Sequence, residues 1–204
     1  MNGTFLVFEG IDGSGKRTLC HYAMELLKSR GVPVNPYQYP DYGSPWGRII
    51  EDFLSKKEYL SPSVQFLTYA ADIIKDQPYI KKYLEKGEVV LADRYIISTI
   101  AFQSAHGFDF DTAKAIVRLF EVVPPDVVFY MKVLPRTGRM RKQSQKSKLD
   151  RHEVDTAFLE KVVRMYEKLQ DESFLGKKWI EIDANRELSY VKAEMAAEIK
   201  KILK

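Results

Sequence analysis

Residues 4–18, TFLVFEGIDGSGKRT, decide the fold of this chain. The first six of these residues form an apolar run of strand length that is rich in β-forming types. From Lys16 onward, apolar side chains such as Leu19, Ala23 and Leu27 recur at helical spacing. The glycines therefore join a buried strand to a helix N-terminus, which is the context that a phosphate-binding loop requires.

The loop 10–18 has the chemistry of a nucleoside-triphosphate site. Its three glycines permit backbone angles at which successive N–H groups converge on phosphate oxygens. The helix dipole favours bound anions, and the Lys16 ammonium reaches the β and γ phosphates. The predicted ATP-binding residues of the loop are Gly10, Asp12, Gly13, Ser14, Gly15, Lys16, Arg17 and Thr18.

Arg17 departs from the pattern G-x-x-x-x-G-K-[ST], because a hydroxyl that binds Mg²⁺ normally stands there. A guanidinium cannot ligate a cation. Three readings follow: Mg²⁺ is held by Asp93, water and ATP; Arg17 replaces part of the metal's charge at the β and γ phosphates; or the protein binds nucleotide without turning it over.

The bulk composition is that of one globular domain. The chain has 204 residues, a net charge of +4 and a single cysteine, Cys20, so that no internal disulfide is possible. The longest apolar runs have strand length, and the first strand begins too early to leave room for a leader. We expect a cytoplasmic protein with no membrane partner.

Strand and helix patterns alternate along the whole chain. The strand-like runs are 4–9, 34–39, 88–93, 126–131 and 178–183. Helical spacing is found at 16–29, 45–56, 62–75, 77–86, 97–105, 111–121, 155–171 and 187–203. This order predicts an α/β fold of the P-loop NTPase type, with a five-stranded parallel sheet flanked by helices on both faces. No linker divides residues 1–204, which we interpret as a single domain.

Asp93 and Arg94 directly follow the third strand-like run. Ligands of such sheets bind beyond the carboxyl ends of the strands, so this pair should lie near the phosphate loop. The carboxylate suits hydrated Mg²⁺ and the guanidinium suits a phosphate. An ordinary surface salt bridge at a strand end is the alternative interpretation.

Basic residues are concentrated at 132–151, where eight Lys or Arg stand against one acid, Asp150. Such a run suits a nucleic-acid patch, a solvated loop, or a flexible lid that closes over polyphosphate. Aromatic side chains for base stacking are missing from it. We therefore predict a lid at 135–151 and no nucleic-acid partner.

The chain resembles the thymidylate kinase family of P-loop nucleoside-monophosphate kinases over nearly its whole length. The resemblance rests on the order and spacing of seven segments: Phe8-Glu9-Gly10-x-Asp12-Gly13-x-Gly15-Lys16, Tyr39-Pro40-x-Tyr42-Gly43, Tyr69-Ala70-Ala71-Asp72, Asp93-Arg94-Tyr95-x-x-Ser98-Thr99-x-Ala101-Phe102-Gln103, Pro125-Asp126, Asp150-Arg151-x-Glu153 and Ile182-Asp183-Ala184.

The resemblance implies transfer of the ATP γ-phosphoryl group to dTMP with Mg²⁺, by a homodimer. It assigns catalysis to Lys16, Arg94, Arg141 and Asp12, and metal binding to Asp93 and Asp12. It adds Arg141, Arg151 and Asn185 to the ATP site. The implied dTMP-binding residues are Asp12, Tyr42, Tyr69, Arg94, Thr99, Phe102 and Gln103. Because Gly13 stands where part of the family has a loop arginine, the chain resembles the type in which the lid supplies that charge.

Ile73 stands where the family usually has an arginine that donates to O4 of thymine. Isoleucine cannot donate, and the loss of a donor weakens discrimination among bases. Two alternatives to a strict dTMP kinase therefore stay open. One is a kinase of another or broader set of nucleoside monophosphates, dUMP included. The other is a weakly active nucleotide-binding paralogue.

Overall fold

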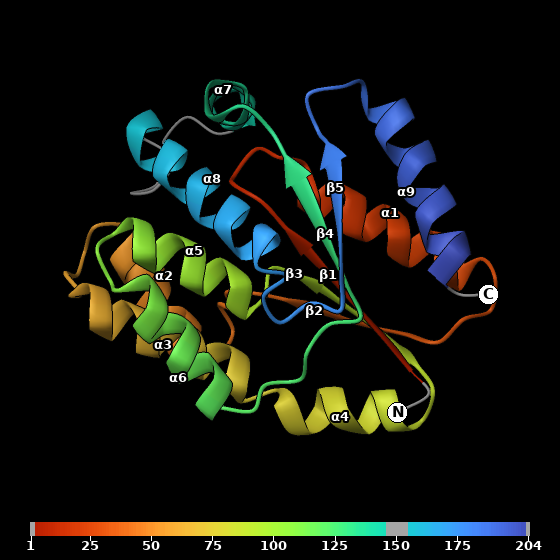
Figure 1. Ribbon diagram of the computed structural model, residues 1–204, viewed down its shortest axis with the longest axis horizontal. Helices are drawn as coiled ribbons and strands as arrows, with labels where there is room; N and C mark the ends of the chain where they lie inside the picture. Colours follow the sequence, from red (N-terminus) through yellow and green to blue (C-terminus); the bar gives the residue numbers. More distant parts are fainter. Residues whose placement is uncertain (1–2, 146–154, 203–204) are drawn as a thin grey trace.

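The computed structural model describes residues 3–145 and 155–202, which are built around a five-stranded parallel sheet (Figure 1). The strand order is β2-β3-β1-β4-β5, and every neighbouring pair is parallel. The strands are β1 (Thr4–Glu9), β2 (Val34–Gln38), β3 (Val89–Asp93), β4 (Val127–Lys132) and β5 (Lys178–Asp183). The predicted fold class is confirmed.

The central strands carry the core. Residues 5–8 of β1 have no solvent-accessible surface, and all five residues of β3 are buried. This continuous burial is what a parallel strand covered on both faces requires. In the register of β1 and β3, Phe8 lies beside Asp93. The phosphate loop and Asp93-Arg94 therefore leave the sheet at the same edge.

Helices cover both faces of the sheet, with α1 and α9 on one side and α5 and α8 on the other (Figure 1). None of the helices within residues 3–145 and 155–202 is long and apolar enough to cross a membrane. Ser61 and Asp155 accept backbone hydrogen bonds at the starts of α3 and α8, which is the role of an N-cap residue. The helices are α1 (Lys16–Lys28), α2 (Pro45–Leu54), α3 (Pro62–Ile74), α4 (Gln77–Glu85), α5 (Ile96–Ala105), α6 (Phe110–Leu119), α7 (Pro135–Gln145), α8 (Thr156–Asp171) and α9 (Leu188–Ile202).

Helix α7 is absent from the helices that the sequence predicts. It occupies most of the basic segment that we expected to be flexible. Of its residues 135–144, only Gly138 is buried, so the helix has no apolar stripe from which it could be recognised. It lies beyond the carboxyl ends of β4 and β5, close to the phosphate loop (Figure 1). The rest of the predicted lid, 146–151, lies outside the described residues.

Candidate active site

The phosphate loop is shaped by left-handed glycines. Gly13 and Gly15 have φ angles of 77° and 85°, values that favour glycine over other residues. Gly15 is the N-cap of α1, and no side chain caps this end of the helix within the described residues. Its free N–H groups and the helix dipole form an anion site. Lys16 folds back over the loop, and its Nζ donates to the carbonyl of Ile11 at 3.1 Å.

A cleft of about 1050 Å³ opens over the phosphate loop. Seven of the predicted ATP-binding residues line it: Gly13, Ser14, Gly15, Lys16, Arg17, Thr18 and Arg141. The other lining residues are Leu19, Lys142, Ala184, Arg186, Leu188 and Val191. Sequence reasoning gave no role to Lys142 or Arg186, and only the clustering of basic residues could have indicated Lys142.

Three predicted ATP-binding residues, Gly10, Asp12 and Asn185, are not among the described lining residues of this cleft, and a fourth cannot be placed. Gly10 and Asp12 precede the lining residues in the same loop. The Asn185 side chain bonds Asp183 and accepts from the N–H of Leu134, whereas its neighbours Ala184 and Arg186 face the cleft. Arg151 lies outside the described residues.

A second cleft, of about 600 Å³, contains every residue predicted to bind dTMP. These are Asp12, Tyr42, Tyr69, Arg94, Thr99, Phe102 and Gln103. They come from the phosphate loop, the turn before α2, helix α3 and the start and body of α5. The fold thus gathers residues that are up to 91 positions apart, from 12 to 103, in one cavity.

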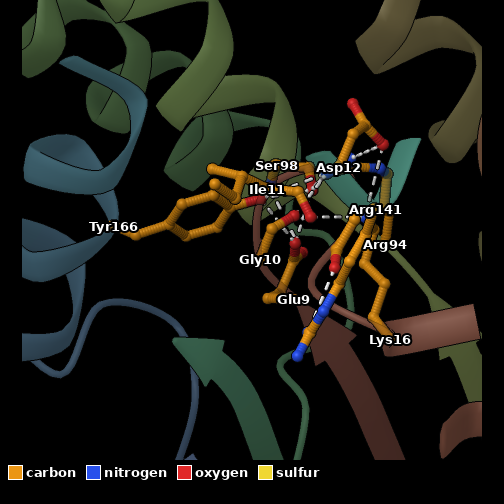
Figure 2. A network of polar contacts seen from close by, with 10 residues as sticks. Glu9, Gly10, Ile11, Asp12, Lys16, Arg94, Ser98, Arg141 and Tyr166 are labelled. Atoms are coloured by element: carbon orange, nitrogen blue, oxygen red, sulfur yellow. Dashed lines mark hydrogen bonds and ion pairs between the residues drawn. The ribbon is translucent and has the colours of Figure 1, made fainter. Parts of the chain in front are cut away.

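Arg94 lines the second cleft and also contacts the phosphate loop, whose residues Gly10 and Asp12 lie beside it in Figure 2. Its backbone is left-handed, with φ 71°, and its guanidinium donates to the carbonyl of Gly10 at 3.0 Å. It also pairs with Asp12 at 2.8 Å and lies 4.9 Å from the centre of the Phe102 ring. Lys16 approaches the same Asp12 oxygen at 3.5 Å. A cation from each cleft therefore meets at one carboxylate.

Glu9 is a site residue that sequence reasoning missed. It is fully buried and accepts hydrogen bonds from the N–H of Tyr95 and from the hydroxyls of Ser98 and Tyr166 (Figure 2). Ser98 and Tyr166 in turn contact Arg94, at 3.0 and 3.4 Å. Glu9, Ser98 and Tyr166 thus fix the position of the Arg94 guanidinium through a buried hydrogen-bond network. Its one sequence signal is an acid that ends an otherwise apolar strand.

Comparison with known proteins identifies the family. The thymidylate kinase family model matches residues 8–195. A probable thymidylate kinase of Staphylothermus marinus is 33% identical over 93% of this chain and 91% of its own length. The thymidylate kinase of Schizosaccharomyces pombe is 29% identical over 95% and 90% of the two chains. A thymidylate kinase of Thermoanaerobacter sp. is 30% identical and is matched over the full length of both chains.

This chain belongs to the thymidylate kinase family. It is therefore a kinase, and the family that the sequence motifs predicted is confirmed. Two of the motifs that carried the prediction, the phosphate loop and Asp93-Arg94-Tyr95, lie at the carboxyl edge of this kinase's sheet, where the two clefts meet. Pro125-Asp126 precedes β4 and lies at the opposite edge, where the Asp126 carboxylate accepts from the N–H of Phe5.

Asp12 carries a negative charge between the two cations Arg94 and Lys16. Burial by itself raises the pKa of this carboxyl, but the charges of Arg94 and Lys16 outweigh burial and hold its pKa well below the usual range. Burial raises the pKa of Glu9. Its hydrogen bonds and the charge of Arg94 lower this pKa, but they offset only part of the effect of burial. Asp12 is thus a permanent anion that the two cations share.

Asp93 is the carboxylate best suited to a metal. It is 8% exposed, and its Oδ1 has no hydrogen-bond partner within the described residues. A buried oxygen without a partner is costly unless a ligand satisfies it. Asp12 is less available, because Arg94 and Lys16 already pair with it. Residues 3–145 and 155–202 contain no group of three potential metal ligands, so water and nucleotide oxygens would complete the shell.

ATP affinity of the kinase is expected to fall in mildly alkaline solution. Burial, and next the charge of Arg94, lowers the pKa of Lys16 to about 8. The lysine is charged below this pH and becomes neutral as the pH rises through it, so phosphate loses a cation. The Kd for ATP should rise about tenfold between roughly pH 7 and pH 9. Titration calorimetry at several pH values measures it.

The matched variant is Lys16→Arg, because a guanidinium stays charged over this range. Its ATP affinity need not equal that of the parent, but the rise in Kd near pH 8 should disappear. An equally steep rise in both proteins would assign the pH dependence to a group other than Lys16.

Proposed function

We propose that this kinase uses the second cleft for dTMP and the first for ATP with Mg²⁺, and transfers the γ-phosphoryl group to give dTDP and ADP. One observation carries the assignment of the clefts: Asp12 and Arg94 line one cleft, Lys16 lines the other, and all three meet within 3.5 Å contacts. The acceptor phosphate and the γ phosphate would therefore approach each other at this junction.

The reaction needs positioning and positive charge. An oxygen of the dTMP phosphate forms a bond to the γ phosphorus of ATP, and the bond from that phosphorus to the β-γ bridging oxygen breaks as ADP leaves. Lys16 and Arg94 would hold the donor and acceptor phosphates. Arg141 lies beside the loop, where it donates to the carbonyls of Ala184 at 2.9 Å and Gly13 at 3.5 Å. Three cations would surround the migrating group.

Mg²⁺ is the proposed cofactor, with Asp93 as its protein carboxylate. When bound, it would neutralise charge on the β and γ phosphates. Arg17 is exposed and lines the ATP cleft, so its guanidinium is placed to bind phosphate oxygens. This supports the reading in which Arg17 supplies part of the charge that the usual hydroxyl supplies through the metal.

Replacing Arg17 by threonine should strengthen the binding of Mg²⁺ at the phosphate loop. We expect the Mg²⁺ concentration for half-maximal rate to fall about threefold to tenfold, because a hydroxyl ligand is added. The ATP KM at saturating Mg²⁺ should rise, because a phosphate-binding cation is lost. Steady-state rates over a Mg²⁺ titration measure both quantities. If neither changes, Arg17 is a bystander.

An ADP-release assay with dTMP, dUMP, dGMP and dCMP tests the proposed reaction. Turnover fastest with dTMP supports it, and comparable turnover with dUMP supports the broader kinase that Ile73 leaves open. If none of the four acceptors is turned over, the weakly active nucleotide-binding paralogue is favoured instead.

A homodimer formed through α2, α3 and the end of α6 is part of the proposal. An apolar groove lies over these helices and is lined by Trp46, Leu67, Ala70, Ala71, Ile74, Lys75 and Phe120. Leu67 is 53% exposed, and Ile49 and Val64 expose nearly as much. Large exposed apolar patches mark protein interfaces. Sedimentation of Leu67→Glu should give monomer where the parent gives dimer.

The remaining proposals concern location and the lid. The single cysteine, Cys20, is buried as a free thiol, which supports a reducing cytoplasm as the working compartment. We retain one domain over 1–204 and a lid at 135–151. The described part of that lid supports the assignment, because Arg141 already contacts the phosphate loop.

A further inference from the structure

Gln103 is the unusual residue of the acceptor cleft. It lies on α5, lines the cleft, and has no solvent-accessible surface. Neither its amide oxygen nor its amide nitrogen has a hydrogen-bond partner within the described residues. Among the other described residues that line the cleft, none has a buried side-chain nitrogen or oxygen that lacks a hydrogen-bond partner. A buried amide with two unmet hydrogen bonds is a recognition group that awaits a ligand.

The charged side chains that line the cleft already have protein partners. Arg94 is the single cation among the described lining residues, and it is bound to Asp12 and Gly10 at the phosphate end. Asp72 accepts from the N–H of Asp41 at 2.8 Å and from the Ser44 hydroxyl at 2.7 Å. The base edge would therefore be read by uncharged side chains, and among the described lining residues Gln103 is the one whose buried polar atoms lack partners.

Lys75 cannot supply a cation to the base. Its Nζ lies 3.3, 3.1 and 2.8 Å from carboxylate oxygens of Asp41, Asp72 and Asp76. Ile73, which is 2% exposed and lines the cleft, presents only hydrocarbon. Neither Ile73 nor Lys75, at the end of α3, therefore offers the base a side chain that can only donate hydrogen bonds.

Gln103 also lies at the right distance along the cleft. It is seven residues beyond the start of α5 at Ile96, which corresponds to about 10 Å of helix. Arg94 stands just before that start. A nucleoside monophosphate with its phosphate at Arg94 would place its base beside the later turn of α5.

We infer that the base site of this kinase accepts both pyrimidine patterns, so that it phosphorylates deoxycytidine-type as well as thymidine-type monophosphates. A glutamine amide carries one donor and one acceptor side by side. A half-turn about its last side-chain bond exchanges them, and that torsion is broad. One orientation fits the N3–H donor and O4 acceptor of thymine. The other fits the N3 acceptor and N4 amino donor of cytosine. This inference rests on the proposed function of the cleft.

The comparison that isolates the base edge is dTMP against 5-methyl-dCMP. Both carry the 5-methyl group, and they differ only at position 4 and in the N3 proton. The balanced reaction is the same for both: the acceptor phosphate oxygen bonds to the γ phosphorus, and ADP leaves. We expect the two kcat/KM values to agree within about thirtyfold, compared with far larger ratios at sites of fixed polarity. A larger ratio would overturn the inference.

Two variants test whether Gln103 is responsible for the ratio of the two kcat/KM values. Gln103→Leu removes the amide at nearly constant volume, and it should lower kcat/KM for both substrates by the same factor, within about threefold. Selective loss of dTMP turnover would show that Gln103 reads one pattern only, which overturns the inference. Gln65→Leu, which removes a buried glutamine outside this cleft, is the matched control and should leave the ratio unchanged.

Ile73→Arg adds a donor-only group to the same wall. It should favour the O4 acceptor over the N4 amino group and shift the ratio toward dTMP by about tenfold or more. An unchanged ratio in a folded variant would contradict the assignment of this wall to the base. Should this variant fail to fold, the parent comparison and Gln103→Leu still decide.

The two proposals fail in different ways. If dTMP itself is not phosphorylated, the proposed function of the cleft is wrong. If dTMP is phosphorylated and 5-methyl-dCMP is not, the proposed function stands and the inference about Gln103 is wrong.

Discussion

Replacing Arg94 with leucine is expected to lower kcat/KM for dTMP by about 10³-fold to 10⁵-fold, the range that an arginine on a migrating phosphoryl group contributes. Arg94 lies where the two clefts meet and is held by Asp12, Gly10 and Ser98. Leucine keeps an apolar side chain at this position but has neither the reach nor the charge of the guanidinium. Asp12, relieved of its main partner, would also repel the acceptor phosphate.

Steady-state kinetics with separate kcat and KM values for dTMP and ATP measure the effect. KM for dTMP should rise and kcat should fall, whereas KM for ATP should change little, because Lys16 and the loop are intact. Arg164→Leu is the matched control, since Arg164 is exposed on α8 and lines neither cleft. A loss of less than about tenfold in Arg94→Leu would remove Arg94 from the proposed chemistry.

Replacing Gly138 with alanine should lower kcat/KM for ATP by about a hundredfold, as expected for a phosphate-binding group displaced by about 1 Å. A Cβ at Gly138 would lie 2.6 Å from the carbonyl oxygen of Asp12, and one at Gly13 would lie 2.0 Å from the carbonyl of Gly138. Both neighbours are backbone atoms and cannot give way cheaply. Helix α7 would therefore move off the loop and carry Arg141 with it.

Gly13→Ala should reproduce the loss, because the contact between the two glycines is mutual. Gly31→Ala is its control: Gly31 also has a left-handed φ, 73°, but a Cβ there meets nothing within 4 Å. Thermal melts separate lost stability from lost rate. If Gly138→Ala retains full activity, the described position of α7 does not matter for turnover.

The packing of α7 on the phosphate loop also gives a physical reason for Gly13. An arginine at this position would meet the backbone of α7, so the loop cannot carry that charge while the helix is seated there. Arg141, one turn after Gly138, supplies a guanidinium beside the loop instead. The sequence predicted a lid that supplies arginine, and the structure adds why the loop does not.

Much of the fold could be predicted because its signals are local. Strands such as β3 are buried on both faces and read as unbroken apolar runs, and helices such as α8 repeat apolar residues at three or four positions. The phosphate loop is a local motif too. Helix α7 escaped prediction because its burial consists of one glycine against another segment, which leaves no periodic pattern.

By itself, the sequence determined the family, the parallel sheet and the chemistry of the phosphate loop, because these depend on short patterns and their order along the chain. The tertiary structure alone decided what holds Arg94 and which polar groups of the second cleft lack partners. Glu9 and Tyr166 are 157 positions apart, yet their side chains bond at 3.0 Å behind Arg94. The resemblance implied that Gln103 binds dTMP, but its lack of hydrogen-bond partners within the described residues depends on how its surroundings pack. Hydrogen bonding between distant elements depends on how those elements pack, and no local pattern records it.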